Sequence, residues 1–283
     1  MLEVIEDALI DSIKLLPFLF ITYLLMEYIE HKTSEKAKEA IKKSGKFGPL
    51  YGSILGAFPQ CGFSVAATNF YAARVITLGT LIAVYLSTSD EMLPIFISES
   101  VPLTTILIVI GIKIVIGMIA GFIIDFVLRK RNKGVCEEQI VDLCEKEHCH
   151  CENGILKSSI KHTLNIFVFI LLITLVINTL IYFIGEETLS NFILNKPIIG
   201  PIIAGLIGLI PNCASSVIIT KMYLSNVINF ATMMSGLLVG AGVGLVVLFK
   251  TNKGVKNNIK IMLLLYGIGV GVGILLELIG FSI

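Results

Sequence analysis

The sequence predicts an all-α protein that crosses a membrane about ten times and is built from two repeats of opposite topology. Of its 283 residues, 55% are hydrophobic and only 15% are charged, whereas soluble domains average about 25% charged residues. Several apolar runs approach the roughly 20 residues that a helix needs to span a bilayer. A motif in the first half also recurs in the second. We therefore expect a multi-pass protein of the cell (cytoplasmic) membrane, surrounded by the lipid bilayer.

Hydropathy indicates six simple spans and two interrupted ones. The interrupted stretches, 75–100 and 226–249, contain "STSDEMLP" (87–94) and "GAGVG" (240–244). We interpret each as two short helices, which brings the count to ten. The simple spans are 9–28, 48–70, 103–128, 163–184, 197–220 and 260–280.

The distribution of Lys and Arg predicts the orientation. With ten spans and the N-terminus outside, 18 of the 22 Lys and Arg residues fall in cytoplasmic loops or at the edge of the last span. Because positively charged loops stay in the cytoplasm, we expect both termini outside. The net charge is only +1 and the basic residues form no single patch, so nucleic acid is not an expected partner.

A shift of 152 residues aligns "GPLYGSILGAFPQCGFSVAAT" (48–68) with "GPIIAGLIGLIPNCASSVIIT" (200–220), and eight of the 21 pairs are identical. Five spans in each half is an odd number, so the halves would lie in the membrane with opposite topology. Inverted repeats with interrupted helices are typical of secondary transporters, whose substrate binds near the midplane. We predict an N-terminal membrane repeat (1–128), a cytosolic loop (129–160) and a C-terminal membrane repeat (161–283).

Each repeat carries a Pro-amide-Cys motif within an apolar stretch. Pro59 and Pro211 each remove a backbone donor and predict a helix break, and the freed carbonyl groups must then line a protein-buried or polar cavity. The residues after each proline supply an amide oxygen, a thiolate and a hydroxyl, and these groups are metal ligands. The alternative is a pair of proline kinks with cysteines that pack as small apolar residues. The predicted transport site is Gln60, Cys61, Ser64, Asn212, Cys213 and Ser216.

Lys113 lies near the centre of the span 103–128. A charge inside a membrane is costly and indicates a functional residue. Asp90 and Glu91, at a helix interruption, are its candidate partners, and the three are predicted to couple transport to a proton or another ion. A static structural ion pair is the alternative.

The polar loop "CEEQIVDLCEKEHCHCENG" (136–154) follows the basic cluster "RKRNK". Its cysteine and histidine side chains are soft or borderline metal donors, and in the cytosol such cysteines are more typical of metal binding than of disulfides. A purely solvated loop is the alternative. The predicted loop ligands are Cys136, Cys144, His148, Cys149, His150 and Cys151.

With "GAFPQCGFS", "GLIPNCASS", the duplicated halves and the Cys/His loop, the chain resembles the ten-transmembrane heavy-metal exporter family, a group that includes proteins described as arsenic efflux proteins or manganese transporters. The resemblance covers essentially the whole chain and implies efflux of a metal or metalloid.

We therefore predict a secondary-active exporter rather than an enzyme. The transition metal ion is its substrate, with manganese, iron, zinc and arsenite left open, and no organic cofactor is expected. No HExxH, GxSxG, Walker or GxGxxG element stands in a suitable context. An intramembrane thiol oxidoreductase and a transporter of an organic solute with a metal-sensing loop are the alternatives. The oligomeric state stays open, with a homodimer as one candidate.

Overall fold

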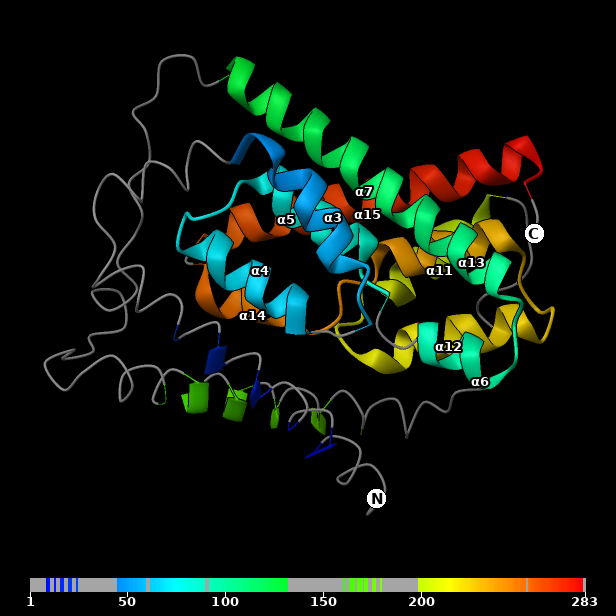
Figure 1. Cartoon of the computed structure of the whole chain (residues 1–283), viewed down its shortest axis with the longest axis horizontal. Helices are drawn as coiled ribbons and strands as arrows, with labels where there is room; N and C mark the ends of the chain where they lie inside the picture. Colours follow the sequence, from blue (N-terminus) through cyan, green and yellow to red (C-terminus); the bar gives the residue numbers. More distant parts are fainter. Residues whose placement is uncertain are drawn as a thin grey trace, which may run out of the picture.

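The computed structural model describes residues 45–59, 62–89, 92–131, 198–252 and 254–281, together with single positions within 9–24 and 160–179. Every regular element in these ranges is helical, and none of them contains a strand. Two groups of five α-helices follow one another in the same order (Figure 1). The all-α prediction is therefore confirmed for this part of the chain.

The first group begins after a short 3-10 turn, η1 (Gly45–Phe47). Pro49 stands in the first turn of α3, where its missing N–H costs no intrahelical bond. The helices are α3 (Gly48–Gly56), α4 (Gly62–Ala72), α5 (Leu78–Ser87), α6 (Met92–Ser98) and α7 (Leu103–Arg131).

The second group has the same sequence of short and long helices. Its α13 ends at Val239 and α14 begins at Gly244, at the glycine-rich stretch where the sequence predicts an interruption. The helices are α11 (Ile199–Gly208), α12 (Cys213–Leu224), α13 (Phe230–Val239), α14 (Gly244–Thr251) and α15 (Val255–Ile279).

The turns after α4 and α12 have the same backbone geometry, 152 residues apart. Arg74 and Asn226 both have positive φ angles, 64° and 56°. The N–H of each bonds to the carbonyl of a tyrosine three residues earlier, Tyr71 or Tyr223, at 2.9 and 3.0 Å. The register found in the sequence thus holds in the backbone well beyond the aligned motif.

Close helix packing repeats in the same register. A Cβ added to Gly121 on α7 would meet the backbone oxygen of Gly79 at 2.6 Å and the Pro49 Cβ at 2.8 Å. A Cβ added to Gly273 on α15 would meet the backbone oxygen of Ala231 and the Pro201 Cβ, both at 3.1 Å. Each long helix therefore contacts its own repeat through glycine, because only glycine permits such a close approach of backbones.

Short helices of each repeat pack against short helices of the other repeat. Every residue of α13 is buried, as is every residue of α5 after Leu78. The helices α7 and α15 run across one side of the molecule (Figure 1). On the opposite side α4 packs beside α14, and α12 packs beside α6 (Figure 1). The helix after each Pro-amide-Cys motif thus lies against the short helix of the other repeat, and we call these two contacts the α4–α14 crossing and the α6–α12 crossing.

Four stretches in the described ranges are long and apolar enough to cross a membrane. They include the interrupted pairs α5–α6 and α13–α14 and the single helices α7 and α15. Two shorter apolar helices, Ile199–Gly208 and Ala214–Leu224, accompany them.

Candidate functional site

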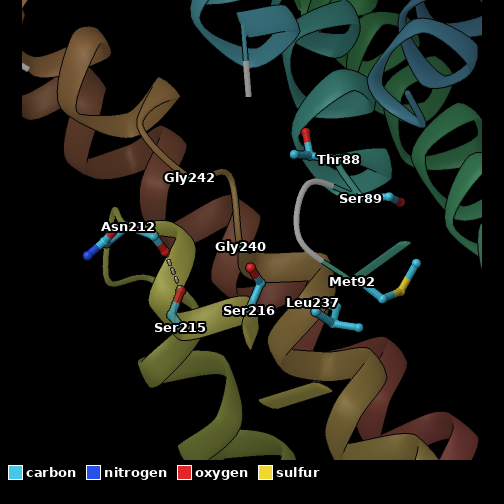
Figure 2. A pocket seen from close by; sticks show the side chains of 9 residues that line it. All are labelled: Thr88, Ser89, Met92, Asn212, Ser215, Ser216, Leu237, Gly240 and Gly242. Carbon is cyan, nitrogen blue, oxygen red and sulfur yellow. Dashed lines mark hydrogen bonds between the residues drawn. The ribbon is translucent and has the colours of Figure 1, made fainter. Parts of the chain in front are cut away.

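A pocket lies where three interruptions of the helices meet. Its walls come from the end of α5 and the start of α6, from the first turn of α12, and from the end of α13 with the segment that follows (Figure 2). The volume of the cavity is about 10 Å³, close to the smallest that holds one water molecule. The lining residues are Thr88, Ser89, Met92, Asn212, Ser215, Ser216, Leu237, Gly240 and Gly242.

Three of the lining hydroxyls donate their protons to backbone oxygens nearby. Thr88 Oγ1 donates to Val84 at 2.8 Å, Ser89 Oγ to Ser87 at 3.0 Å, and Ser215 Oγ to Asn212 at 2.8 Å. A hydroxyl that has donated its proton keeps its lone pairs. The pocket wall is therefore rich in oxygen atoms that accept, and such atoms suit a metal ion or a ligand that carries O–H groups.

Two predicted site residues of the second motif line this pocket. Asn212 precedes α12 as its N-cap residue and is only 4% exposed, and Ser216 lies in the first turns of the helix. The backbone of Cys213 begins α12, whereas its side chain lies outside what the structure describes. Gln60 and Cys61 also lie outside the described residues.

Ser64, the remaining predicted residue, lies at the α4–α14 crossing and is fully buried. A Cβ added to Gly244, the first residue of α14, would meet the Ser64 Cβ at 3.0 Å. Within the described ranges, the two serines of the repeated motif thus lie at different crossings. The pocket is lined by one of them, Ser216.

A hydrogen-bonded cluster fills the α4–α14 crossing. The hydroxyl oxygens of Thr68 and Tyr85 lie 2.6 Å apart, and both reach the backbone oxygen of Gly244 at 3.2 Å. Thr68 Oγ1 also contacts the backbone oxygen of Ser64 at 2.7 Å. Sequence reasoning did not single out Tyr85. The repeat register could have identified it, because the register pairs this tyrosine with an apolar residue, Leu237, in the second repeat.

Lys113 on α7 is completely buried. Its ammonium group donates to the backbone oxygens of Thr88 and, at 3.1 Å, Leu237. Both acceptors line the pocket, so the charge predicted from sequence lies directly behind the pocket wall. Asp90 and Glu91, its predicted partners, lie outside the described residues.

The described ranges contain no group of three or more His, Cys, Asp or Glu side chains that could hold a metal ion. The Cys/His loop, with Cys136, Cys144, His148, Cys149, His150 and Cys151, lies outside them.

Residues 1–187 match the family described as "Putative, 10TM heavy-metal exporter". The chain belongs to this family. The match covers the first group of helices and the loop and ends before α11. No curated protein and no solved structure matches the chain.

Membership in this exporter family, together with the apolar helices, identifies a multi-pass membrane protein. The family description agrees with the predicted number of ten spans and supports membrane transport of metals in general.

Proposed function

We propose that this member of the exporter family is a secondary-active exporter that moves a transition or heavy metal ion out across the cytoplasmic membrane. The observation that carries the proposal is the repeat itself. Two apolar stretches in each group are divided into two short helices at equivalent positions, and interruptions from both groups meet at the pocket. Interrupted helices at a repeat interface are where secondary transporters bind their substrates.

The two groups act as inverted repeats in this proposal. The register of 152 residues is supported by the matching turns at Arg74 and Asn226 and by the matching contacts of Gly121 and Gly273. Five elements per repeat would turn the second repeat over in the membrane. Transport then proceeds by rocking one repeat against the other around the bound ion.

Pro59 and Pro211 stand between α3 and α4 and between α11 and α12. We assign the helix interruptions to them, because proline cannot donate to the carbonyl four residues earlier. The freed carbonyl groups take over part of the hydration shell of the ion. The remaining ligands come from the amide, thiol and hydroxyl groups of Gln60, Cys61, Asn212, Cys213 and Ser216. Ser64 is not included, because it packs against Gly244 at the α4–α14 crossing.

The Cys/His loop would collect the metal on the cytosolic side. Its donors (136–151) precede the second repeat, and the orientation inferred from Lys and Arg places them where an exporter loads its cargo. The metal passes from there to the membrane site, and Lys113 with Asp90 and Glu91 couples its passage to an ion gradient.

The test measures metal efflux from cells that express the wild-type chain or the double variant Cys61→Ala/Cys213→Ala. We expect the wild type to lower cellular manganese, zinc or arsenic, as measured by elemental analysis. The double variant should retain about tenfold more metal at the same protein level, because the ion loses both thiolate ligands, and the effect should be smallest for manganese, which prefers oxygen ligands.

The matched control is Cys136→Ala/Cys144→Ala, which also removes two thiols but leaves the membrane site intact. At high external metal, where loading by the loop is not limiting, it should export like the wild type. Normal export by Cys61→Ala/Cys213→Ala would show that these cysteines are packing residues and would overturn the proposed site.

A further inference from the structure

The helix α3 runs parallel to α5. A Cβ added to Gly48, the first residue of α3, would meet the side chain of Thr80 near the start of α5. A Cβ added to Gly56, the last residue of α3, would meet the hydroxyl oxygen of Ser87, the last residue of α5. The two helices therefore begin at one level of the bundle and end at another, side by side.

The next helix, α4, returns beside α5 in the opposite direction. The turn 73–77 joins the end of α4 to the start of α5, so these two ends lie close together. Farther from the turn, Thr68 of α4 lies beside Tyr85 of α5, with their hydroxyl oxygens 2.6 Å apart. The helices α3 and α4 therefore form a hairpin, and the chain reverses near Pro59.

The second repeat has the same arrangement. Ser235 of α13 donates from Oγ to the backbone oxygen of Pro201, in the first turn of α11, at 2.7 Å. A Cβ added to Gly208, the last residue of α11, would meet the Cβ of Val239, the last residue of α13, at 3.3 Å. The helix α11 thus runs in the same direction as α13, as α3 does with α5.

The helix α12 then returns beside α13. The turn 225–229 joins the two helices, and a Cβ added to Gly236 of α13 would meet Ile219 Cδ1 of α12 at 2.5 Å. The chain reverses between α11 and α12, near Pro211. Each Pro-amide-Cys motif therefore occupies the stretch of sequence where a hairpin reverses.

Both hairpins are short for a membrane. The helices α3 and α4 have 9 and 11 residues, and α11 and α12 have 10 and 12. At a rise of about 1.5 Å per residue, helices of this length extend over about half of a hydrocarbon core of about 30 Å. The interrupted pairs α5–α6 and α13–α14, in contrast, are long enough to cross it.

The two hairpins lie at opposite ends of the molecule. Thr77, in the turn after α4, donates to Asp125 near the end of α7, which finishes in the basic residues 129–131. Asn229, in the turn after α12, donates to Glu277 near the end of α15. Figure 1 shows α4 with α14 at the end of the molecule where α7 finishes, and α12 with α6 at the other end.

We propose that α3–α4 and α11–α12 are re-entrant hairpins that enter the membrane from the cytoplasm and from outside, respectively, and that they form the two gates of the metal path. The α4–α14 crossing closes the cytoplasmic side, and the α6–α12 crossing closes the outer side. Each hairpin carries its motif to mid-membrane, where irregular backbone is tolerated only if it is buried in protein or lines a cavity. The gating role rests on the proposed function; the topology does not.

This topology replaces the single spans that hydropathy predicts at 48–70 and 197–220. Each repeat keeps three crossings, an odd number: one span predicted from sequence, the interrupted pair and the long helix. The repeats therefore remain inverted. Arg74 moves to the cytoplasmic side and Lys221 to the outside, so 18 of the 22 Lys and Arg residues are still cytoplasmic. The charge distribution fits both topologies equally well, and only the packing of the helices separates them.

Hydrogen bonds between the repeats close the cytoplasmic gate in this structure. The hydroxyls of Thr68 and Tyr85 both donate to the backbone oxygen of Gly244 at 3.2 Å. Nearer the cytoplasmic end, Asn257 Nδ2 donates to the hydroxyl oxygen of Tyr71 at 3.2 Å. Metal can enter from the cytosol only after α4 has moved away from α14 and these bonds have broken.

The topology is tested with Val75→Cys and Val227→Cys, which occupy equivalent positions in the two turns. An impermeant thiol reagent should label Val227→Cys in intact cells and Val75→Cys only after permeabilisation. Val75→Cys should thus react from the same side as the native loop cysteines of the wild type, whatever the orientation of the whole protein. Both variants are made in full-length protein with serine in place of the four loop cysteines, Cys136, Cys144, Cys149 and Cys151.

Single spans at 48–70 and 197–220 give the reverse pattern, with Val75→Cys on the side opposite the loop, and this result would refute the hairpins. If the half-buried Val75→Cys does not react from either side, Val227→Cys decides alone, because Val227 is 48% exposed. Its labelling from the side of the loop also refutes them. The labelling needs no transport activity.

The gates are tested with Ser64→Cys/Gly244→Cys, which places two thiols across the α4–α14 crossing. A Cβ at Gly244 lies 3.0 Å from the Ser64 Cβ, so a small shift reaches the Cβ–Cβ distance of about 3.8 Å found in disulfides. A membrane-permeant oxidant should abolish metal export, and a reducing agent should restore it. Wild-type cells treated alike correct for oxidation of the native cysteines.

The matched control is Gly48→Cys/Thr80→Cys, which joins α3 to α5 within one repeat. A Cβ at Gly48 lies 3.4 Å from the Thr80 Cβ, so this pair should also form a disulfide, yet export should continue. If the reduced Ser64→Cys/Gly244→Cys protein is inactive or does not fold, a bifunctional thiol reagent applied to Tyr71→Cys/Asn257→Cys tests the same gate with the same expected loss.

Unchanged export after the cross-link across the α4–α14 crossing has formed contradicts the gate, and so does an equal loss of export in the control. Mass spectrometry of the purified protein verifies that each cross-link is present. A wild type that exports no metal contradicts the proposed function instead, while the labelling of Val75→Cys and Val227→Cys still decides the topology. The two failures are therefore distinguishable.

Discussion

The ammonium group of Lys113 donates a hydrogen bond of 3.1 Å to the backbone oxygen of Leu237 and so joins the long helix of one repeat to the buried helix of the other. It also bonds to the backbone oxygen of Thr88, the C-cap residue that follows α5. A cation at the carbonyl ends of two helices is favoured by both helix dipoles. Lys113 is thus a structural link between repeats as well as a candidate for coupling.

Lys113→Met should lower the free energy of unfolding by about 2 kcal/mol, because two buried carbonyl oxygens lose a charged donor. The check is the fraction of protein that stays monodisperse after heating, followed by size-exclusion chromatography. Leu265→Met is the matched control, since it changes a buried residue at the equivalent position with little change in volume. Equal heat stability of Lys113→Met and the wild type would mean that the cost of burying the charge offsets its bonds.

Asp125 and Glu277, 152 residues apart, bind the starts of α5 and α13. Asp125 accepts from the Thr77 hydroxyl at 2.7 Å and from the Gly79 N–H at 2.9 Å. Glu277 accepts from Asn229 Nδ2 and from the Ile198 N–H, both at 3.0 Å. The repeat therefore preserves a carboxylate that ties the end of each long helix to the N-cap residue of each buried helix.

We expect Asp125→Ala to cost about 3 kcal/mol of stability, because two donors lose a charged acceptor at a site that is only 7% exposed. Glu277→Ala should cost about half as much, since its surroundings are more open to screening. Thermal unfolding in detergent measures both, with Glu99→Ala, at an exposed carboxylate, as the control. A smaller loss for Asp125→Ala than for Glu277→Ala contradicts this order.

Glycines of the long helices separate into two kinds. A Cβ at Gly121 would collide with the Gly79 carbonyl oxygen at 2.6 Å, whereas a Cβ at Gly111 or Gly271 meets nothing within 4 Å. Gly121→Ala should therefore destabilise the protein by about 1–3 kcal/mol through overpacking. Gly111→Ala and Gly271→Ala should be neutral or stabilising by up to about 1 kcal/mol, because alanine favours the helix. Heat stability of all three variants at matched expression tests this contrast.

The orientation of the Cys/His loop can be tested with an impermeant thiol reagent. If the loop is cytosolic, as the Lys and Arg distribution predicts, Cys149 and Cys151 in intact cells should not react, and permeabilised cells should show rapid labelling. Deletion of 136–152 should weaken export at low metal and leave export at high metal nearly unchanged, since the loop only loads the cargo. Labelling in intact cells would reverse the orientation and with it the direction of transport.

Much of the fold follows from local sequence. Hydropathy predicts the apolar helices because each residue contributes to membrane transfer largely independently of its contacts. The glycine-rich stretch between α13 and α14 is visible without coordinates, and so are the two proline motifs. The register of 152 residues predicts the equivalence of Asp125 and Glu277, and the structure adds that each carboxylate binds an N-cap residue of its own repeat.

The site followed from sequence only in part. Asn212 and Ser216 were predicted, and both line the pocket, yet Thr88, Ser89, Ser215 and Leu237 line it as well. Such hydroxyl and leucine residues are common in membrane helices, so their type alone does not indicate a site. Their role depends on the segments that surround them.

The sequence by itself determined the membrane character, the register of 152 residues and the glycine-rich interruption between α13 and α14, because composition and periodicity are properties of neighbouring residues. Tertiary structure decided which interrupted helices of one repeat pack against which helices of the other. It placed α4 against α14 and α12 against α6, and it joined Tyr85 to Gly244, 159 residues away. Contacts over such separations depend on how the helices pack, and no local pattern encodes them. Tyr85 and Leu237 occupy equivalent positions in the two repeats, yet only the packed helices show that Tyr85 bonds across the α4–α14 crossing while Leu237 lines the pocket.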